Sequence, residues 1–223
     1  LSDRIGVRRP MLIGSLALAV GAGLPALMPG LPALFVSATI VGVAFMLFQV
    51  ATQNATGEMG GPGERAHNFS LLALGYSVSG ILGPLIAGCT IDQGSYRLAF
   101  AVLAVIPLVP AAVLGAGKLV LPGPHPAREA RPAGGALALL THVKLRRVFF
   151  VNVLLAMGWD LHMIVIPIYG ASLGLSASQI GMILAAFAAA TFIVRFSMRW
   201  IVRHYSEHQV LTIALVTAGT VYL

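Results

Sequence analysis

Residues 10–57 read PMLIGSLALAVGAGLPALMPGLPALFVSATIVGVAFMLFQVATQNATG, and they include no Asp, Glu, Lys, Arg or His. As one helix this stretch would be about 72 Å long, more than twice the roughly 30 Å hydrocarbon core of a bilayer. It must therefore fold back. Two prolines and a glycine at residues 28–32 interrupt any helix there. The stretch predicts two membrane helices, near residues 11–28 and 31–53, joined by a short turn.

The rest of the chain continues this pattern. Further apolar segments predict spans at about 69–91, 98–117, 148–168 and 178–200, and a seventh that begins near residue 209. Only 9% of the 223 residues are charged and 58% are hydrophobic. A soluble domain carries about a quarter charged residues, so this composition argues against a soluble enzyme. Because helices satisfy their own backbone hydrogen bonds in lipid, the predicted fold is an all-α, polytopic membrane protein.

Basic residues mark alternate loops. Of the 14 Lys and Arg residues, every one except Arg97 lies in or beside the loops on one side of the predicted spans. The positive-inside rule makes this side cytoplasmic, and we expect the plasma (inner) membrane. The net charge of +7 then marks a membrane face rather than a nucleic-acid partner.

Residues 118–147 hold four prolines and the largest cluster of basic charge, which is typical of a linker. This predicts a first helical group at 1–117, a cytoplasmic linker at 118–147 and a second group at 148–223. The chain begins with Leu1 and stops inside an apolar run, so we expect a piece of a longer protein.

The first nine residues, LSDRIGVRR, form a short loop with an acid, a glycine suited to a sharp turn and three arginines. The acid can bind a helix N-terminus, and the cations can bind acids on neighbouring helices. This loop resembles the one between helices 2 and 3 of the major facilitator superfamily, whose pattern Gly-x-Leu-[small]-Asp-Arg-x-Gly-Arg-Arg it matches from the Leu onward except at Val7. The resemblance implies that the first span is helix 3 of twelve. It also implies a cytoplasmic gating motif, whose members here are Asp3, Arg4, Gly6, Arg8 and Arg9.

Later segments are similar to the same family in the expected order. Glu58 and Arg65 look like the acid and arginine between helices 4 and 5, and Glu58 becomes a candidate partner for the arginines of the first loop. Residues 79–88, SGILGPLIAG, are similar to the antiporter pattern of helix 5 and contribute Gly83, Pro84 and Gly88. Plain helix packing through small residues is the alternative interpretation of this motif. Residues 96–100, YRLAF, resemble the entry to helix 6.

One acid lies deep inside a predicted span. Asp160 falls about 18 Å into the helix that starts near residue 148, close to the membrane midplane, and charges there are functional candidates by default. We expect Asp160 to bind a proton or a cationic substrate; the alternative is a structural hydrogen bond to a neighbouring helix. Asn152 shares its helix face. His162 lies about 200° further round, so it cannot share that face, and it either assists Asp160 or lies near the outer mouth.

Polar residues of the span at 31–53 extend this candidate site. Gln49 and Gln53 form part of a polar stripe that either faces Asp160 across the translocation path or is solvated at the helix end. Arg195, Arg199 and Arg203 recur every four residues, and we expect them to extend to the lipid headgroups rather than to bind substrate. Proton-coupled exporters of the family usually have an arginine in helix 4, where this chain has Ala38. The antiporter pattern therefore favours antiport, whereas the missing arginine argues against the usual coupling device.

The sequence is thus interpreted as a partial major facilitator fold, with about seven transmembrane helices of an expected twelve. The expected function is secondary active transport of a small solute by alternating access, with proton-coupled efflux as the finer hypothesis. The expected partners are that solute, the lipid bilayer and protons, with no cofactor, no metal, no nucleic acid and a monomeric full-length state. We expect no enzyme activity, because the chain has no nucleophile constellation and no phosphate-binding loop. The alternatives are a non-transporting seven-helix receptor or scaffold, or an inactive truncated transporter.

Overall fold

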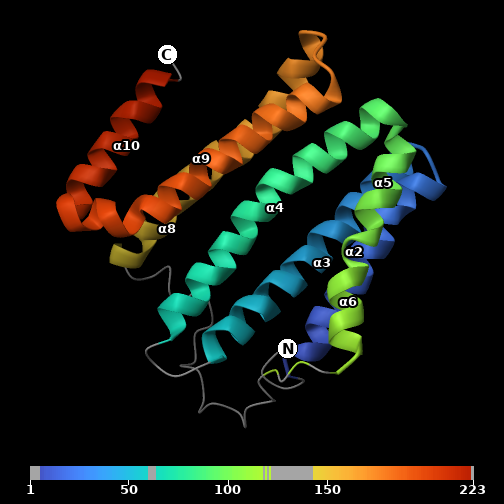
Figure 1. The fold of residues 1–223 in the computed structure, drawn as a ribbon, viewed down its shortest axis with the longest axis horizontal. Helices are drawn as coiled ribbons and strands as arrows, with labels where there is room; N and C mark the ends of the chain where they lie inside the picture. The colour runs from blue at the N-terminus through green and yellow to red at the C-terminus, as the bar shows by residue number, and fades with distance from the viewer. Residues whose placement is uncertain (1–5, 60–63, 118, 120, 122–142, 222–223) are drawn as a thin grey trace.

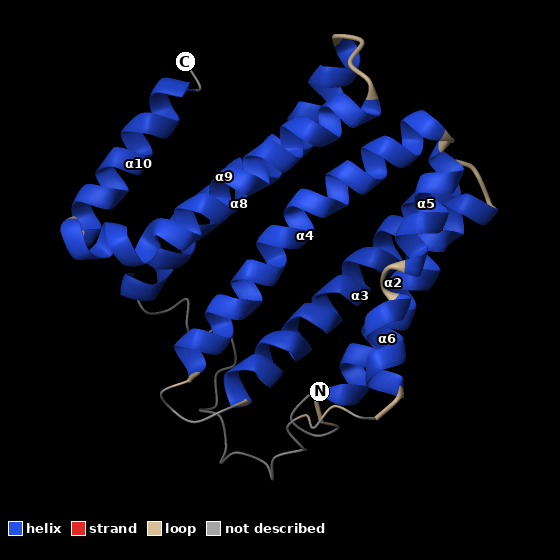
Figure 2. Ribbon diagram, in the orientation of Figure 1, coloured by secondary structure: helices blue, strands red, loops and turns tan. Residues whose placement is uncertain are grey.

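The computed structural model describes residues 6–59, 64–117, 119, 121 and 143–221. Within these ranges the chain forms helices joined by turns, and none of the described residues is in a strand (Figure 2). The helices are α2 (Arg8–Leu27), α3 (Leu31–Glu58), α4 (Arg65–Gln93), α5 (Tyr96–Val105), α6 (Leu108–Gly115), α8 (Val143–Ser172), α9 (Ala177–His204) and α10 (Glu207–Val221).

The predicted reversal after the first span is confirmed. α2 ends at Leu27, and α3 begins directly after Gly30, which has a φ of +153° that glycine tolerates and other residues rarely adopt. The predicted span at 98–117 is interrupted, because α5 ends before Pro107 and α6 restarts at Leu108. Pro107 and Pro110 lack the N–H groups that a continuous helix would use, so the chain turns slightly and then resumes.

The helices run back and forth between two ends (Figure 1). Near one end lie the start of α2, the end of α3, the start of α4 and the end of α6; we call this the basic end, because the predicted basic loops belong to it. The turns at residues 28–30, 94–95 and 173–176 lie at the opposite end. The loops that alternate in charge along the sequence therefore lie at alternate ends of the bundle, with the basic loops at one end.

α2 is the central helix of the N-terminal group, where it packs against α3, α5 and α6. α4 packs against α3 and α5 on one side and extensively against α9 on the other, and α9 in turn contacts α8. The seam between α4 and α9 thus joins the two predicted helical groups.

Small side chains fill the interior, and large apolar ones face outward. Among the described residues, the buried positions are mainly Ala, Gly and Ser, and the largest side chain that is fully buried is Ser15. Phe35 and Phe196 are 70% and 75% exposed. This is the reverse of a soluble core, and it is expected where lipid solvates the outer face and small residues let helix backbones approach. Six helical segments of the described chain are long and apolar enough to cross a membrane.

Candidate functional site

The loop before α2 turns at Gly6 and fixes α2 against α6. Gly6 has a φ of +77°, a backbone conformation for which glycine is suited. Val7 follows at 3% exposure in an apolar cluster with Met11, Ala51 and Leu114, from α2, α3 and α6. This burial explains why position 7 departs from the family pattern, since an unpaired basic side chain would be costly there.

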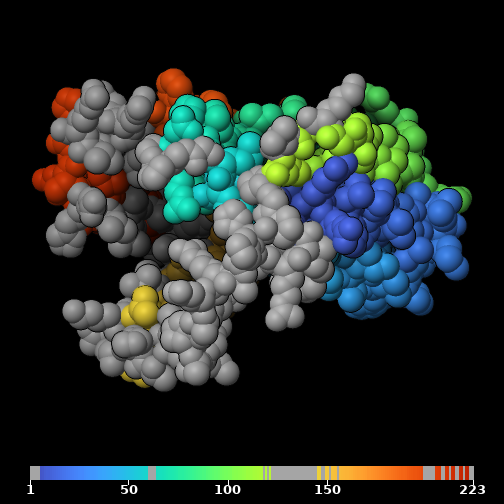
Figure 3. All heavy atoms as spheres, turned by 90° about the horizontal axis from the view of Figure 1, so that it is seen from below, coloured from blue at the N-terminus to red at the C-terminus, as the bar shows by residue number. Residues whose placement is uncertain are grey.

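Arg8 holds the end of α6. Its Nε donates to the carbonyl oxygen of Leu114 at 2.9 Å and its Nη2 to that of Gly115 at 3.3 Å. A cation at a helix C-terminus binds carbonyls that have no partner within the helix, and it also complements the helix dipole. Gly117 has a φ of +72° and would bring a Cβ atom to 3.0 Å from Nη2 of Arg8. Sequence reasoning missed Gly117, although a glycine just after a helix end is a usual C-terminal signal. Figure 3 shows the start of α2 against α6 from below.

The expected carboxylate partner of Arg8 is not observed. Within the described part of the chain, Arg8 donates to backbone carbonyls and forms no ion pair with Glu58, which is exposed at the end of α3. Arg9 and Arg65 are also exposed. Asp3 and Arg4 lie outside the described residues. In the described part of the motif, it is Arg8 that contacts α6, because the carbonyls at the end of α6 lie within its reach.

A second arginine makes the reciprocal contact at the opposite end. Arg97, near the start of α5, donates from Nε to the carbonyl oxygen of Ala26 at the end of α2, at 3.0 Å. α2 runs antiparallel to α5 and α6. Arg8 in the first turn of α2 therefore reaches the last carbonyls of α6, and Arg97 in the first turn of α5 reaches those of α2. Arg97 is the basic residue that departed from the charge alternation, and this contact gives it a structural role.

The helix-5 motif lies on the seam between α4 and α9. A Cβ atom added to Gly88 would clash with the Ala177 carbonyl oxygen and lie 3.0 Å from Cα of Ser178. A Cβ atom at Gly181 of α9 would clash with the carbonyl oxygen of Pro84. Gly83, by contrast, faces open space. Two of the three motif residues therefore serve close packing between the two helical groups.

Asp160 and His162 lie on different sides of α8. His162 stacks on Phe187 of α9, with ring centroids 4.2 Å apart, and Trp159 contacts the same ring at 5.0 Å. Asp160 is exposed, and the helical spacing places it away from the face that α9 covers. The predicted separation of Asp160 and His162 therefore corresponds to two environments, an aromatic contact for His162 and an open face for Asp160.

The other predicted polar residues are spread over two helices that do not adjoin. Asn152 is exposed on α8, whereas Gln49 is half-buried and Gln53 exposed on α3. α3 packs on α2 and α4, and α8 packs on α9. The described chain does not bring the α3 stripe into contact with Asp160.

Two residues bridge α4 and α9. Arg195 was expected to extend to the headgroups, but its Nη1 instead donates to the carbonyl oxygen of Ala73 at 3.0 Å and to Oγ of Ser77 at 2.9 Å. Asp92, which sequence reasoning missed, accepts from the backbone N–H groups of Ala177 and Ser178, at 3.0 and 2.8 Å. The side chains of Arg199 and Arg203 lie outside the described residues. The signal for Asp92 was available as an acid beside a turn, but its partner is distant in sequence.

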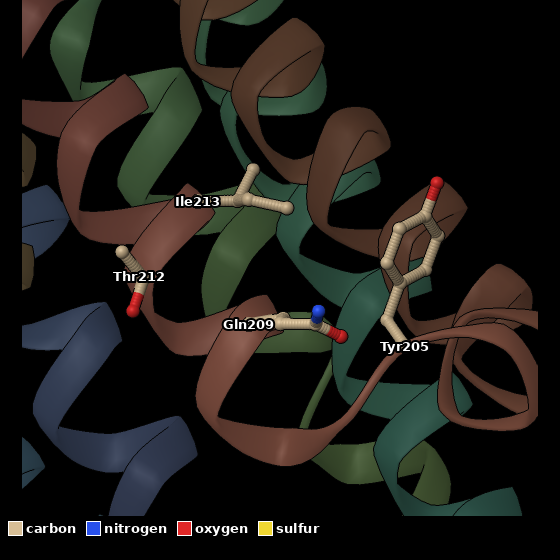
Figure 4. Close-up of a pocket in the computed structure, with 4 residues that line it drawn as sticks. All are labelled: Tyr205, Gln209, Thr212 and Ile213. Carbon is tan, nitrogen blue, oxygen red and sulfur yellow. The ribbon is translucent and has the colours of Figure 1, made fainter.

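A hollow of about 260 Å³ lies where α10 begins, lined by Tyr205, Gln209, Thr212 and Ile213 (Figure 4). Gln209 also helps to cap α10, because its Oε1 accepts from the N–H of Ser206 at 3.0 Å. The lining carries no Asp, Glu, Lys or Arg, and it includes none of the predicted site residues. The hollow lies beside the turn between α9 and α10.

Comparison with known proteins agrees with this architecture. No curated protein matches the chain. The sequence profile of the Major Facilitator Superfamily, however, matches residues 1–223. Together with the helical bundle and the six apolar spans of the described residues, this match identifies the chain as an integral membrane protein that belongs to the Major Facilitator Superfamily, a family of membrane transporters of small molecules.

Proposed function

We propose that this chain forms helices 3–9 of a secondary active transporter that moves a small solute by alternating access and couples its export to protons. The basic end faces the cytoplasm of a cell bounded by the plasma (inner) membrane, and the full-length transporter works as a monomer. The family match supports transport in general. The helix-5 motif on the seam between α4 and α9 supports antiport, because that seam joins the two groups that must rock.

Asp160 is the observation that carries the proposal. Within the apolar span Asn152–Ser172, it lies eight residues from one end and twelve from the other, or about 12 and 18 Å along the helix axis. A carboxylate at this depth costs about 2.5–3.5 kcal/mol on insertion scales. A side chain that faced lipid would bear this cost without compensation, whereas one that faced a water-filled cavity would not. The face of α8 that carries Asp160 therefore lines the translocation path.

The remaining candidate residues take roles around this carboxylate. Asn152 lies eight residues before Asp160 on the same face of α8. Gln49 and Gln53 of α3 form the opposite wall of the cavity. His162, stacked on Phe187, belongs to the wall between α8 and α9. Because position 38 is Ala, proton coupling depends on Asp160 rather than on a helix-4 arginine.

The loop from Asp3 to Arg9 works as a cytoplasmic latch in this proposal. Arg8 fixes the base of that loop to the end of α6. Asp3 and Arg4 engage the other half of the transporter when the cytoplasmic side closes, as Glu58 and Arg65 do at the next basic loop. Rigid attachment at Arg8 lets the loop move with its helical group.

The test is transport by the complete transporter in proteoliposomes, with and without a pH gradient. A screen of organic cations and anions first finds a transported solute. In Asp160→Asn, gradient-driven accumulation should fall by about 5- to 150-fold, the range of a 1–3 kcal/mol coupling free energy, while downhill exchange persists. Asp160→Glu, which keeps the carboxyl group, is the control and should stay coupled. Unchanged accumulation in Asp160→Asn would overturn the assignment.

A further inference from the structure

The seam between α4 and α9 has a polar contact toward each of its ends. Along its middle, small residues of α4 meet small residues of α9: the Cβ position of Gly80 lies 3.3 Å from Cβ of Ala188, and Pro84 meets Gly181. Such a surface offers no directional bonds between side chains, because small residues meet there by close packing alone. The polar contacts beyond it are therefore the directional ones that a change of tilt would break.

Asp92 provides the contact at the opposite end of the bundle. Its two carboxylate oxygens accept from the first two amides of α9, those of Ala177 and Ser178. α9 also has a cap of its own, in which Oγ of Ser176 accepts from the N–H of Gln179 at 3.2 Å and Oε1 of Gln179 accepts from the N–H of Ser176 at 2.9 Å. α9 therefore begins with its own capping box, and Asp92 adds a bond between the two helical groups.

Arg195 provides the contact nearer the basic end. It lies 18 residues after Ala177, about 27 Å further along α9. Its partner Ser77 is 5% exposed and itself donates to the carbonyl oxygen of Ala73 at 3.1 Å. The guanidinium thus binds a hydrogen-bonded pair on α4. This contact and the Asp92 contact lie toward opposite ends of the small-residue seam.

We propose that Asp92 and Arg195 are opposing latches that set the balance between the two open states of the transporter. This inference rests on the alternating access proposed above. Asp92 holds the outer end of the seam closed, and Arg195 holds the inner part closed. Both act through the positions of α4 and α9 and touch no substrate.

The geometry makes each latch specific to one state. If the seam pivots midway between the two contacts, each lies about 13 Å from the pivot, and a rotation of about 15° displaces it by about 3.5 Å. Hydrogen bonds near 3 Å do not survive such a displacement. Opening the outer side therefore breaks the Asp92 contacts and preserves those of Arg195, and opening the inner side does the reverse. Removing the Asp92 contacts therefore shifts the population toward the outward-open state, and removing those of Arg195 shifts it toward the inward-open state.

The test measures distances between spin labels in the complete transporter, with Cys89 replaced by serine. One label pair, at Gln93 and Leu173, reports the outer end, and a second pair, at His67 and Tyr205, reports the inner end. Asp92→Ala should raise the outward-open fraction about two- to fivefold, which is the effect of an exposed charge at a helix N-terminus.

Arg195→Met keeps the apolar stem and removes the donors, so it should raise the inward-open fraction about fivefold. Arg195→Lys, which keeps a donor, should restore part of the balance and serves as a second variant if Arg195→Met folds poorly. The matched control is Gln179→Ala, which removes the acceptor for the N–H of Ser176 and so weakens the start of α9, while the partners of Asp92 stay in place. It should leave both distance distributions unchanged.

The proposal is contradicted if both variants shift the population in the same direction, or if the capping-box control shifts it as Asp92→Ala does. It is also contradicted if the unmodified transporter populates two states and neither variant changes their ratio. A transporter with one unchanging set of distances, with and without solute and pH gradient, would instead contradict alternating access itself. The two failures are therefore distinguishable.

Discussion

Gly88→Ala tests whether the helix-5 motif works as a packing surface. The new Cβ atom would lie 2.9 Å from the Ala177 carbonyl carbon and 3.0 Å from Cα of Ser178, where ordinary contacts are 3.4–4 Å. Both neighbours are backbone atoms, so no side chain can rotate away. α4 and α9 must separate by about half an ångström or more, and we expect a destabilisation of about 1–3 kcal/mol, the usual cost of overpacking.

Gly83→Ala is the matched control, because it makes the same change in the same motif at a position that faces open space. The assay is the thermal unfolding midpoint of the complete transporter in detergent, followed by size-exclusion chromatography. Gly88→Ala should lower the midpoint by several degrees, whereas Gly83→Ala should leave it unchanged or raise it slightly, since alanine favours helix. Equal shifts in the two variants, or a larger loss in Gly83→Ala, would refute the packing argument.

Two further predictions concern contacts within the N-terminal group and use the same assay. Ser37 donates from Oγ to the carbonyl oxygen of Gly21 on α2, so Ser37→Ala should cost about 0.6 kcal/mol, whereas Thr39→Ala should be neutral because Thr39 is exposed and bonds only within α3. Equal losses would contradict this. Arg97→Ala removes the hydrogen bond to Ala26 and should lower the free energy of unfolding by about 0.3–1 kcal/mol, an effect that high salt reduces. An unchanged midpoint would contradict a structural role for this contact.

Much of the architecture could be predicted from the sequence. The uncharged stretch at 10–57, the turn at Gly30 and the alternation of basic loops predicted the helices and their directions, because membrane insertion depends on length, hydropathy and charge. The interruption between α5 and α6 was not predicted, because residues 96–115 stay apolar across Pro107 and Pro110 and so look like one span.

The site was predictable only in part. Asp160 and His162 were separated correctly by helical spacing, since both lie on one helix. The partners of Arg8 and Arg195 were not, because both arginines bind backbone carbonyls of helices about a hundred residues away. Backbone carbonyls have no sequence signature, and only the packing of helices brings them within reach of a guanidinium group.

The sequence by itself determined that this is a helical membrane protein of the major facilitator type, which helices run in which direction, and which acid lies within a span. Those properties depend on each segment and its transfer into lipid. Only the tertiary structure decided that α4 meets α9 and that Asp92 caps a helix of the other group. It also decided that Gly88 has no room for a Cβ atom, whereas Gly83 does. These properties depend on contacts between segments, and small-residue surfaces look alike in sequence until two backbones approach.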